Sequence, residues 1–103
     1  MRRIAVAVAV LAVACGGGEG RVTGTVVGVE GDMTTVTAFE VQTSTGRMRF
    51  VPAPELTGFV DEDGVVAAPL AHLREHLLDG FPVRVTFRTE GDTNLAVLLE
   101  DAP

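Results

Sequence analysis

The sequence predicts a mainly β domain of five strands and one helix, in the order strand-strand-strand-helix-strand-strand. Several segments rich in β-branched residues are separated by glycine-containing turns, which is typical of strands joined by short connections. A single segment, between the third and fourth strands, has the apolar spacing of a helix. The length of 103 residues is enough for one domain.

The first three predicted strands cover residues 22–29, 35–43 and 47–51. The first contains two glycines, and the alternation of apolar residues is broken between Val26 and Val27. Both features predict a bulge or a bend. The second and third are expected to form a hairpin through a short loop at residues 44–46, because the third alternates apolar and polar residues.

The helix is predicted over residues 69–80, with Pro69 at its first position and Gly80 just past its end. Its leucines recur at helical spacing and predict one apolar stripe that faces the core: Leu70, Leu73 and Leu77. Residues 55–68, which precede the helix, are predicted to be an irregular connection with an acidic turn at 61–64.

The last two strands are predicted over residues 81–89 and 95–99, with 101–103 as a short tail. In the first of them Val83 and Val85 are expected to face the core. The phenylalanines of the strand segments are predicted core residues: Phe39, Phe50, Phe81 and Phe87.

This order of elements, with a bent first strand, resembles the OB-fold, a five-stranded, partly open Greek-key barrel. The resemblance covers residues 22–99 and concerns architecture rather than a motif. It implies a barrel with the helix at one end; a half-open α+β roll of the same elements is the alternative. Closure would protect the strand edges of a small domain whose core is marginal.

The N-terminus carries the pattern of an export signal. Arg2 and Arg3 precede eleven consecutive apolar residues, 4–14. A membrane-spanning helix needs about 20 such residues, whereas this length suits the apolar region of a signal peptide. Residues 1–14 are therefore predicted to be a signal peptide.

The segment Leu11-Ala12-Val13-Ala14-Cys15, followed by a glycine-rich stretch, resembles the bacterial lipobox. It departs from that pattern at Ala12, where the family prefers leucine. The resemblance implies cleavage before Cys15, acylation of its thiol (as with palmitate) and anchoring in the cell envelope outside the cytoplasm. Residues 15–20 would be the tether and 21–103 the domain. The alternatives are a plain secretory signal with an incidental cysteine, or an apolar first strand or helix of a cytoplasmic domain.

The composition argues against nucleic-acid binding. The formal net charge is −6, and the chain contains no Trp or Tyr for base stacking. The shortage of aromatic residues also disfavours saccharides. Four strand arginines could form a local basic patch, but ion pairing with acidic neighbours is the expected explanation: Arg47, Arg49, Arg84 and Arg88.

Residues 72–76, His-Leu-Arg-Glu-His, match the H-x-x-E-H pattern and resemble the inverted zinc proteases. The spacing places the imidazoles of His72 and His76 on one helical face, and the resemblance implies Glu75 as a base. A catalytic zinc needs a third protein ligand, which those enzymes supply from a downstream helix, whereas only strands are predicted after His76. The expected explanation is a solvated helix face, with His72, Glu75 and His76 kept as metal-ligand candidates. The acidic turn at 61–64 fails the calcium-loop pattern, because its twelfth position is His72.

No catalytic set emerges from the remaining residues. Ser44 is the only serine and lies in a predicted loop, and an acylated Cys15 could not act as a nucleophile. We therefore expect a membrane-anchored, non-enzymatic binding or scaffold module without a cofactor, whose partner is an unidentified protein or small molecule. The alternative is a metal-binding protein or metal-dependent enzyme that uses His72 and His76.

Overall fold

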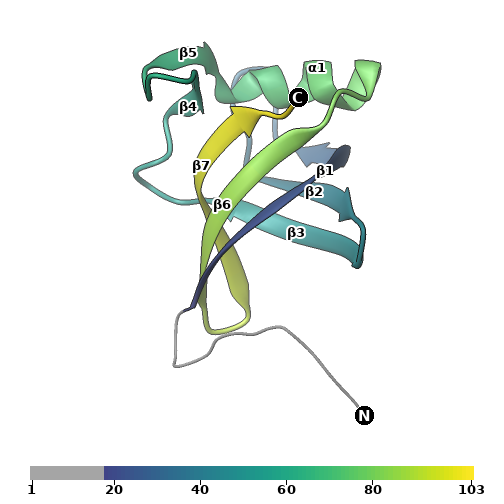
Figure 1. Cartoon of the computed structure of the whole chain (residues 1–103), viewed down its shortest axis with the longest axis vertical. Helices are drawn as coiled ribbons and strands as arrows, with labels where there is room; N and C mark the ends of the chain where they lie inside the picture. The colour runs from purple at the N-terminus through teal and green to yellow at the C-terminus, as the bar shows by residue number, and fades with distance from the viewer. Residues whose placement is uncertain (1–17) are drawn as a thin grey trace.

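The computed structural model describes residues 18–103, so the predicted signal peptide and the lipobox with Cys15 lie outside the described part. Residues 18–103 form strands and one short helical segment (Figure 1). In chain order the elements are β1 (Glu19–Glu30), β2 (Ala38–Thr43), β3 (Gly46–Pro52), β4 (Gly58–Val60), β5 (Val66–Pro69), the 3₁₀ turn η1 (Leu70–His72), α1 (Leu73–Asp79), β6 (Val83–Glu90) and β7 (Thr93–Asp101).

Five of the strands close into a barrel. Antiparallel pairing gives the strand order β3-β2-β1-β6-β7. The two outer strands, β3 and β7, then pair in parallel and close the barrel, with Val51 opposite Leu95 and Pro52 opposite Ala96. The amide of Ala53 extends this seam by donating to the carbonyl of Ala96 at 2.9 Å. Closure confirms the OB-like barrel over the open α+β roll.

Strand β1 belongs to both halves of the barrel because it changes partner along its length. Residues 19–24 pair with β6, and residues 25–30 pair with β2, with a register shift between Val26 and Gly28. The predicted bulge is thus confirmed. At Gly24 the backbones are so close that a Cβ would lie 2.2 Å from the carbonyl oxygen of Gln42.

Aromatic rings fill the barrel. Phe39 stacks on Phe50 with ring centroids 5.4 Å apart, and Phe50 meets the edge of Phe87 at 5.3 Å. The predicted inward residues Val83 and Val85 are fully buried. The prediction for Phe81 is wrong: its side chain is 66% exposed, because β6 begins only after Pro82.

Residues 55–68 are more ordered than predicted. They include β4 and β5, a small hairpin that attaches to the end of β7 through Phe59 and Leu99. The predicted acidic turn joins the two strands, and the Asp61 carboxylate accepts the amides of Asp63 and Val65. Phe59, which the sequence analysis did not single out, is only 2% exposed.

The helical segment covers one end of the barrel (Figure 1). Leu73 is fully buried, but Leu77 is 41% exposed, so the predicted three-leucine stripe is only partly correct. The first turn is 3₁₀, with three residues per turn rather than 3.6, and it rotates the following residues away from the predicted stripe. Among residues 18–103, no helix is both long and apolar enough to cross a membrane.

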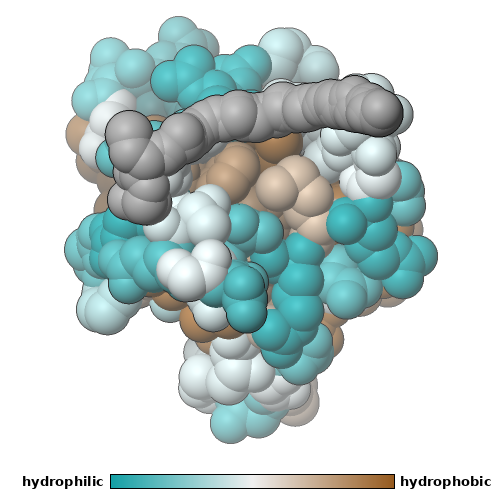
Figure 2. Space-filling model, turned by 90° about the horizontal axis from the view of Figure 1, so that it is seen from below, coloured by the Kyte–Doolittle hydropathy of each residue, from teal (hydrophilic) through white to brown (hydrophobic). Residues whose placement is uncertain are grey.

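Exposed ion pairs cover the barrel wall, as predicted for three of the four strand arginines. Arg47 lies 3.4 Å from Glu40 and Arg49 lies 3.2 Å from Glu30. Arg88 contacts Glu55, and its guanidinium holds the pKa of that carboxyl below the ordinary value. At the barrel end opposite α1, hydrophilic side chains surround a smaller apolar centre (Figure 2).

Gly24→Ala should destabilise the protein by about 2 kcal/mol, because the added methyl group collides with the β2 backbone at the crossing of the two barrel halves. The matched control is Gly28→Ala in the same strand, where a Cβ has its nearest neighbour at 3.7 Å. Urea unfolding of both variants measures the difference. Equal midpoints would show that the crossing tolerates a side chain.

Candidate metal-binding site

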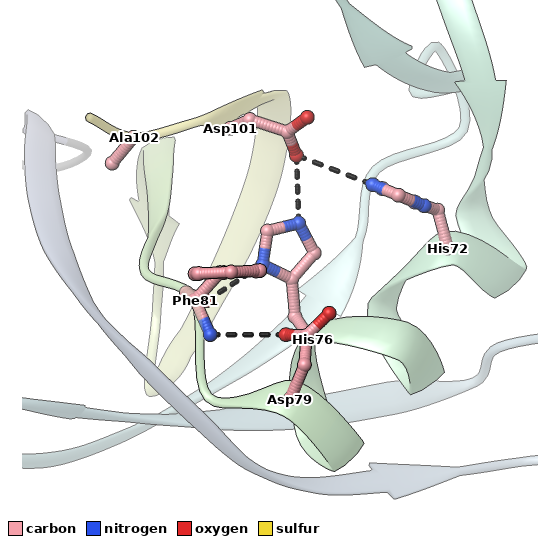
Figure 3. A pocket seen from close by; sticks show the side chains of 6 residues that line it. All are labelled: His72, His76, Asp79, Phe81, Asp101 and Ala102. Atoms are coloured by element: carbon pink, nitrogen blue, oxygen red, sulfur yellow. Dashed lines mark hydrogen bonds and ion pairs between the residues drawn. The ribbon is translucent and has the colours of Figure 1, made fainter.

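The structure brings together two predicted candidates and one residue that was not predicted: His72, His76 and Asp101. Nε2 of His76 lies 2.6 Å from Oδ1 of Asp101, and Nε2 of His72 lies 3.3 Å from the same oxygen. Figure 3 shows one oxygen of the Asp101 carboxylate joined by dashed lines to both imidazoles. One ligand atom from each of the three residues lies within 4.8 Å of the others.

His76 occupies the buried face of α1, three residues after Leu73, and only 4% of it is exposed. The expectation of a solvated histidine face is therefore wrong for this residue. Residues three apart share a helical face, and burial of the ring is tolerated because both of its nitrogens have partners.

The turn that ends α1 sets the orientation of the His76 ring. Gly80 adopts the left-handed conformation, with φ of 78°, as its predicted capping role requires. The chain then reverses, the Phe81 amide donates to Asp79, and the Phe81 carbonyl oxygen comes 2.7 Å from Nδ1 of His76. A carbonyl only accepts, so Nδ1 carries a proton and Nε2 is the nitrogen that faces Asp101.

Asp101 is the residue that sequence reasoning missed. It was assigned to a tail, but β7 continues to Asp101, which pairs with Val83 at the start of β6. This register places its carboxylate under the helical segment, although His76 lies 25 positions earlier in the chain. A candidate for the third ligand that the histidine pattern lacked thus comes from a strand end rather than from a second helix.

His72 lies at the end of η1, and its side chain is 22% exposed. Its Nδ1 faces Oε2 of Glu75 at 3.4 Å, while its Nε2 faces Asp101. Glu75 thus lies next to Nδ1 of His72, the ring nitrogen that does not face Asp101. Its side chain is 70% exposed and does not line the pocket of Figure 3. This position does not suit the role of base that the zinc-protease pattern implied.

Phe59 holds the two imidazoles at right angles. It stacks on His76 with an interplanar angle of 3° and a centroid distance of 5.3 Å, and it meets His72 edge-on at 4.8 Å. The two histidine rings are consequently 90° apart, with centroids separated by 4.9 Å. Phe59, His72 and Asp101 also border a second hollow of about 710 Å³, which Arg84 and Glu100 line as well.

The polar contacts of the site converge on the Asp101 carboxylate. Each Nδ1 faces an oxygen acceptor, and both Nε2 atoms face one carboxylate oxygen. A neutral imidazole protonated on Nδ1 would present a lone pair to that oxygen. At 2.6 Å the contact of His76 with Asp101 has the length of a hydrogen bond, so a metal ion could bind both atoms only if Asp101 moved away from His76.

The outer side of the site opens into a pocket of about 200 Å³. Its lining residues are His72, His76, Asp79, Phe81, Asp101 and Ala102 (Figure 3). The pocket therefore borders all three candidate ligand residues, although only 4% of His76 is exposed.

The comparisons with known proteins find similarity of fold but not of sequence. No protein-family model matches the chain, and no curated protein matches it. Two structures of CusF from Escherichia coli are similar to it. A Cu(II) form of a CusF variant has a TM-score of 0.53, and the match covers 82% of this chain and 92% of the CusF chain. Apo-CusF has a TM-score of 0.51, and the match covers 84% of this chain and 90% of the CusF chain. Both are 14% identical to this chain, so the similarity establishes the OB-like barrel alone.

Without metal, His76→Ala should lower the free energy of unfolding by about 2–4 kcal/mol, because it leaves a cavity and removes two short hydrogen bonds. His72→Ala should cost about 1 kcal/mol or less, since its ring is more exposed and its contacts are longer. Urea unfolding in the presence of a chelator compares them. An equal or larger loss for His72→Ala would contradict the assignment of His76 as the buried member.

Proposed function

We propose that the domain binds a divalent transition-metal ion through Nε2 of His72, Nε2 of His76 and a carboxylate oxygen of Asp101. The observation that carries the proposal is the convergence of both Nε2 atoms on one oxygen while each Nδ1 faces another acceptor. Metal-binding histidines usually donate their other ring N–H to a carbonyl or carboxylate, which fixes the tautomer. His76 has such a partner in the Phe81 carbonyl, whereas Nδ1 of His72 lies 3.4 Å from the Glu75 carboxylate without forming a hydrogen bond.

The three donor atoms lie within 4.8 Å of one another, close to the spacing of ligands on one metal ion. Two ligand atoms on a tetrahedral ion with bonds of about 2.0–2.2 Å are roughly 3.3–3.6 Å apart. The His72–Asp101 distance of 3.3 Å already meets this value, and the 2.6 Å contact of Asp101 with His76 must lengthen. Asp101 can move because its side chain is 64% exposed at the end of a strand.

The donor set favours Zn²⁺ or Cu²⁺ over Cu⁺. Imidazole and carboxylate suit divalent ions of this kind, whereas Cu⁺ prefers thiolate and thioether sulfur. The three donors of this cluster include no sulfur. One of the structural neighbours was solved in a Cu(II) form, which supports including Cu²⁺, and the usual order of affinities places it above Zn²⁺.

We further propose that the role is binding rather than catalysis. The zinc-protease pattern would use Glu75 as the base, but its carboxylate lies beside Nδ1 of His72 and does not line the pocket. Ser44 follows the last residue of β2 in the hairpin loop, on another part of the chain. The partner of the domain would then be the metal ion itself, in place of an unspecified scaffold ligand.

The proposed location is the cell envelope, outside the cytoplasm, with a lipid on Cys15 as the anchor. The support is the sequence alone: an apolar segment of signal-peptide length, a lipobox-like end at Ala14-Cys15 and a glycine-rich stretch before the barrel. Two acyl chains would hold the protein stably, since each buried CH₂ contributes about 0.8 kcal/mol.

Isothermal titration of the full chain with Zn²⁺ and Cu²⁺ tests the metal proposal. Cys15→Ser is included throughout, in mild detergent, so that the thiol cannot bind metal. We expect one ion per chain, with Cu²⁺ tighter than Zn²⁺. Loss of a residue that only hydrogen-bonds to a metal ligand typically lowers metal affinity roughly 10- to 100-fold. His72→Ala and Asp101→Asn remove proposed ligands, so each should weaken binding by more than that.

The matched control for Asp101→Asn is Glu100→Gln, its neighbour in β7, which lies outside the cluster and should bind as the parent does. Absence of saturable binding would refute the metal site. Equal affinities for Asp101→Asn and Glu100→Gln would show that the ion binds elsewhere.

Mass spectrometry of the protein from native membranes tests the anchor. We expect an N-terminus at Cys15 carrying acyl chains, with residues 1–14 removed. Cys15→Ser should abolish the lipid. A chain that retains Met1 and an unmodified thiol would disprove the lipoprotein assignment.

A further inference from the structure

The turn that follows α1 is hydrogen-bonded to both segments that supply the candidate site. The Phe81 carbonyl oxygen lies 2.7 Å from Nδ1 of His76, on the helix. The next carbonyl, that of Pro82, accepts the amide of Ala102 at 3.1 Å, and Ala102 directly follows Asp101 at the end of β7. Two consecutive carbonyls therefore connect the helical candidate and the strand candidate to one short stretch of chain.

Asp79 restrains this turn where it begins. Its Oδ1 accepts the Phe81 amide at 3.0 Å, and such a bond to the backbone two residues on is typical of aspartate in turns. Between them Gly80, with φ of 78°, donates its amide to the carbonyl of His76 at 2.9 Å. From Phe81 the hydrogen bonds continue through the His76 ring to Asp101, as Figure 3 shows.

Helix stability does not account for Asp79. It is the last residue of α1, where the partial negative charge of the helix end disfavours a carboxylate, and aspartate is a poor helix former. Its side chain is exposed, so core packing does not require it either. The interaction that the structure shows for its carboxylate is the hydrogen bond to the Phe81 amide.

The backbone of Phe81 transmits the restraint to the site. Phe81 precedes Pro82, and a residue before proline is largely confined to extended conformations. With few conformations left to this residue, fixing its amide also limits where its carbonyl points. That carbonyl is the acceptor for Nδ1–H of His76, and the bond made by one ring nitrogen sets which nitrogen is left for a metal ion.

We propose that Asp79 is a positioning residue of the metal site. Its hydrogen bond to the Phe81 amide holds the turn in the conformation in which the Phe81 carbonyl accepts Nδ1–H of His76, so that Nε2 is directed at the ion. The inference rests on the proposed function and adds to it a residue that lies outside the cluster of three candidate ligands. Asp79 acts on metal affinity through the turn and not as a ligand.

Two substitutions at Asp79 separate its hydrogen bond from its charge. Asp79→Asn removes the charge but keeps an oxygen that can accept the amide, whereas Asp79→Ala removes both. Each is made in the full chain carrying Cys15→Ser and titrated with Zn²⁺ by calorimetry. Asp79→Ala should weaken Zn²⁺ binding about 3- to 10-fold, at or below the lower end of the effect of losing a direct partner of a ligand. Asp79→Asn should bind Zn²⁺ nearly as the parent does.

Heteronuclear NMR of the Zn²⁺-loaded protein tests whether the effect passes through His76, because it distinguishes a protonated ring nitrogen from a metal-bound one. In the parent and in Asp79→Asn we expect the Nδ1 proton of His76 to be protected from exchange with water. Asp79→Ala should lose that protection.

The matched control is Asp32→Ala. Asp32 is also an exposed aspartate whose carboxylate accepts main-chain amides in a turn, those of Thr34 and Thr35, but it lines neither hollow beside the site. This variant has the same net charge as Asp79→Ala and should keep both the Zn²⁺ affinity of the parent and the protected proton. Urea unfolding of the two metal-free variants should give similar midpoints, which separates a loss of affinity from a loss of overall stability.

Three results would overturn the inference while leaving the metal site intact. Parental Zn²⁺ affinity in Asp79→Ala would show that the site does not need this carboxylate. Equal weakening in Asp79→Asn and Asp79→Ala would show that Asp79 acts through its charge. A protected Nδ1 proton of His76 in Asp79→Ala would show that the effect does not pass through the Phe81 carbonyl. If Zn²⁺ does not bind the parent chain, the proposed function itself is wrong, and the positioning role is refuted with it.

Discussion

The parallel pairing of β3 with β7 is the constraint on which the rest of the structure depends. It turns a row of antiparallel strands into a closed barrel, and the phenylalanine rings of Phe39 and Phe50 become fully buried within it. It also fixes where β7 runs. From this seam β7 continues past the barrel to meet β4, and its last residue arrives beneath the helical segment.

The candidate site is a product of that closure. His76 is contributed by a short helix, Asp101 by the final strand and Phe59 by the added hairpin, so three separate elements must be in place before the donors converge. Nothing in the helix alone would hold the two imidazoles at right angles. The barrel supplies the end on which the helix rests, and the small hairpin supplies the ring against which both histidines pack.

Much of the barrel could be predicted from the sequence because its strands alternate or carry recognisable breaks. The phase slip at Val26 marked the bulge, and the strict alternation at Val83 and Val85 marked the inward face. The hairpin of β4 and β5 could not be predicted in this way, since strands of three and four residues contain too little periodicity.

The site was predictable only in part. The spacing of His72 and His76 indicated a shared function, but the burial of His76 depends on a 3₁₀ turn that the leucine pattern did not reveal. The contribution of Asp101 depends on strand register across the barrel, which local sequence does not encode. Its assignment to a tail followed from the end of the apolar run at Leu99.

The length of β6 separates the two ends of the molecule. Glu19, where the chain enters the barrel, pairs with Arg88, whereas Asp101 pairs with Val83 at the other end of the same strand. At about 3.3 Å per residue, roughly 17 Å of strand lies between Val83 and Arg88. A lipid on the segment before Glu19 would therefore hold the opposite end of the barrel against the bilayer, leaving the histidines facing the aqueous space of the envelope.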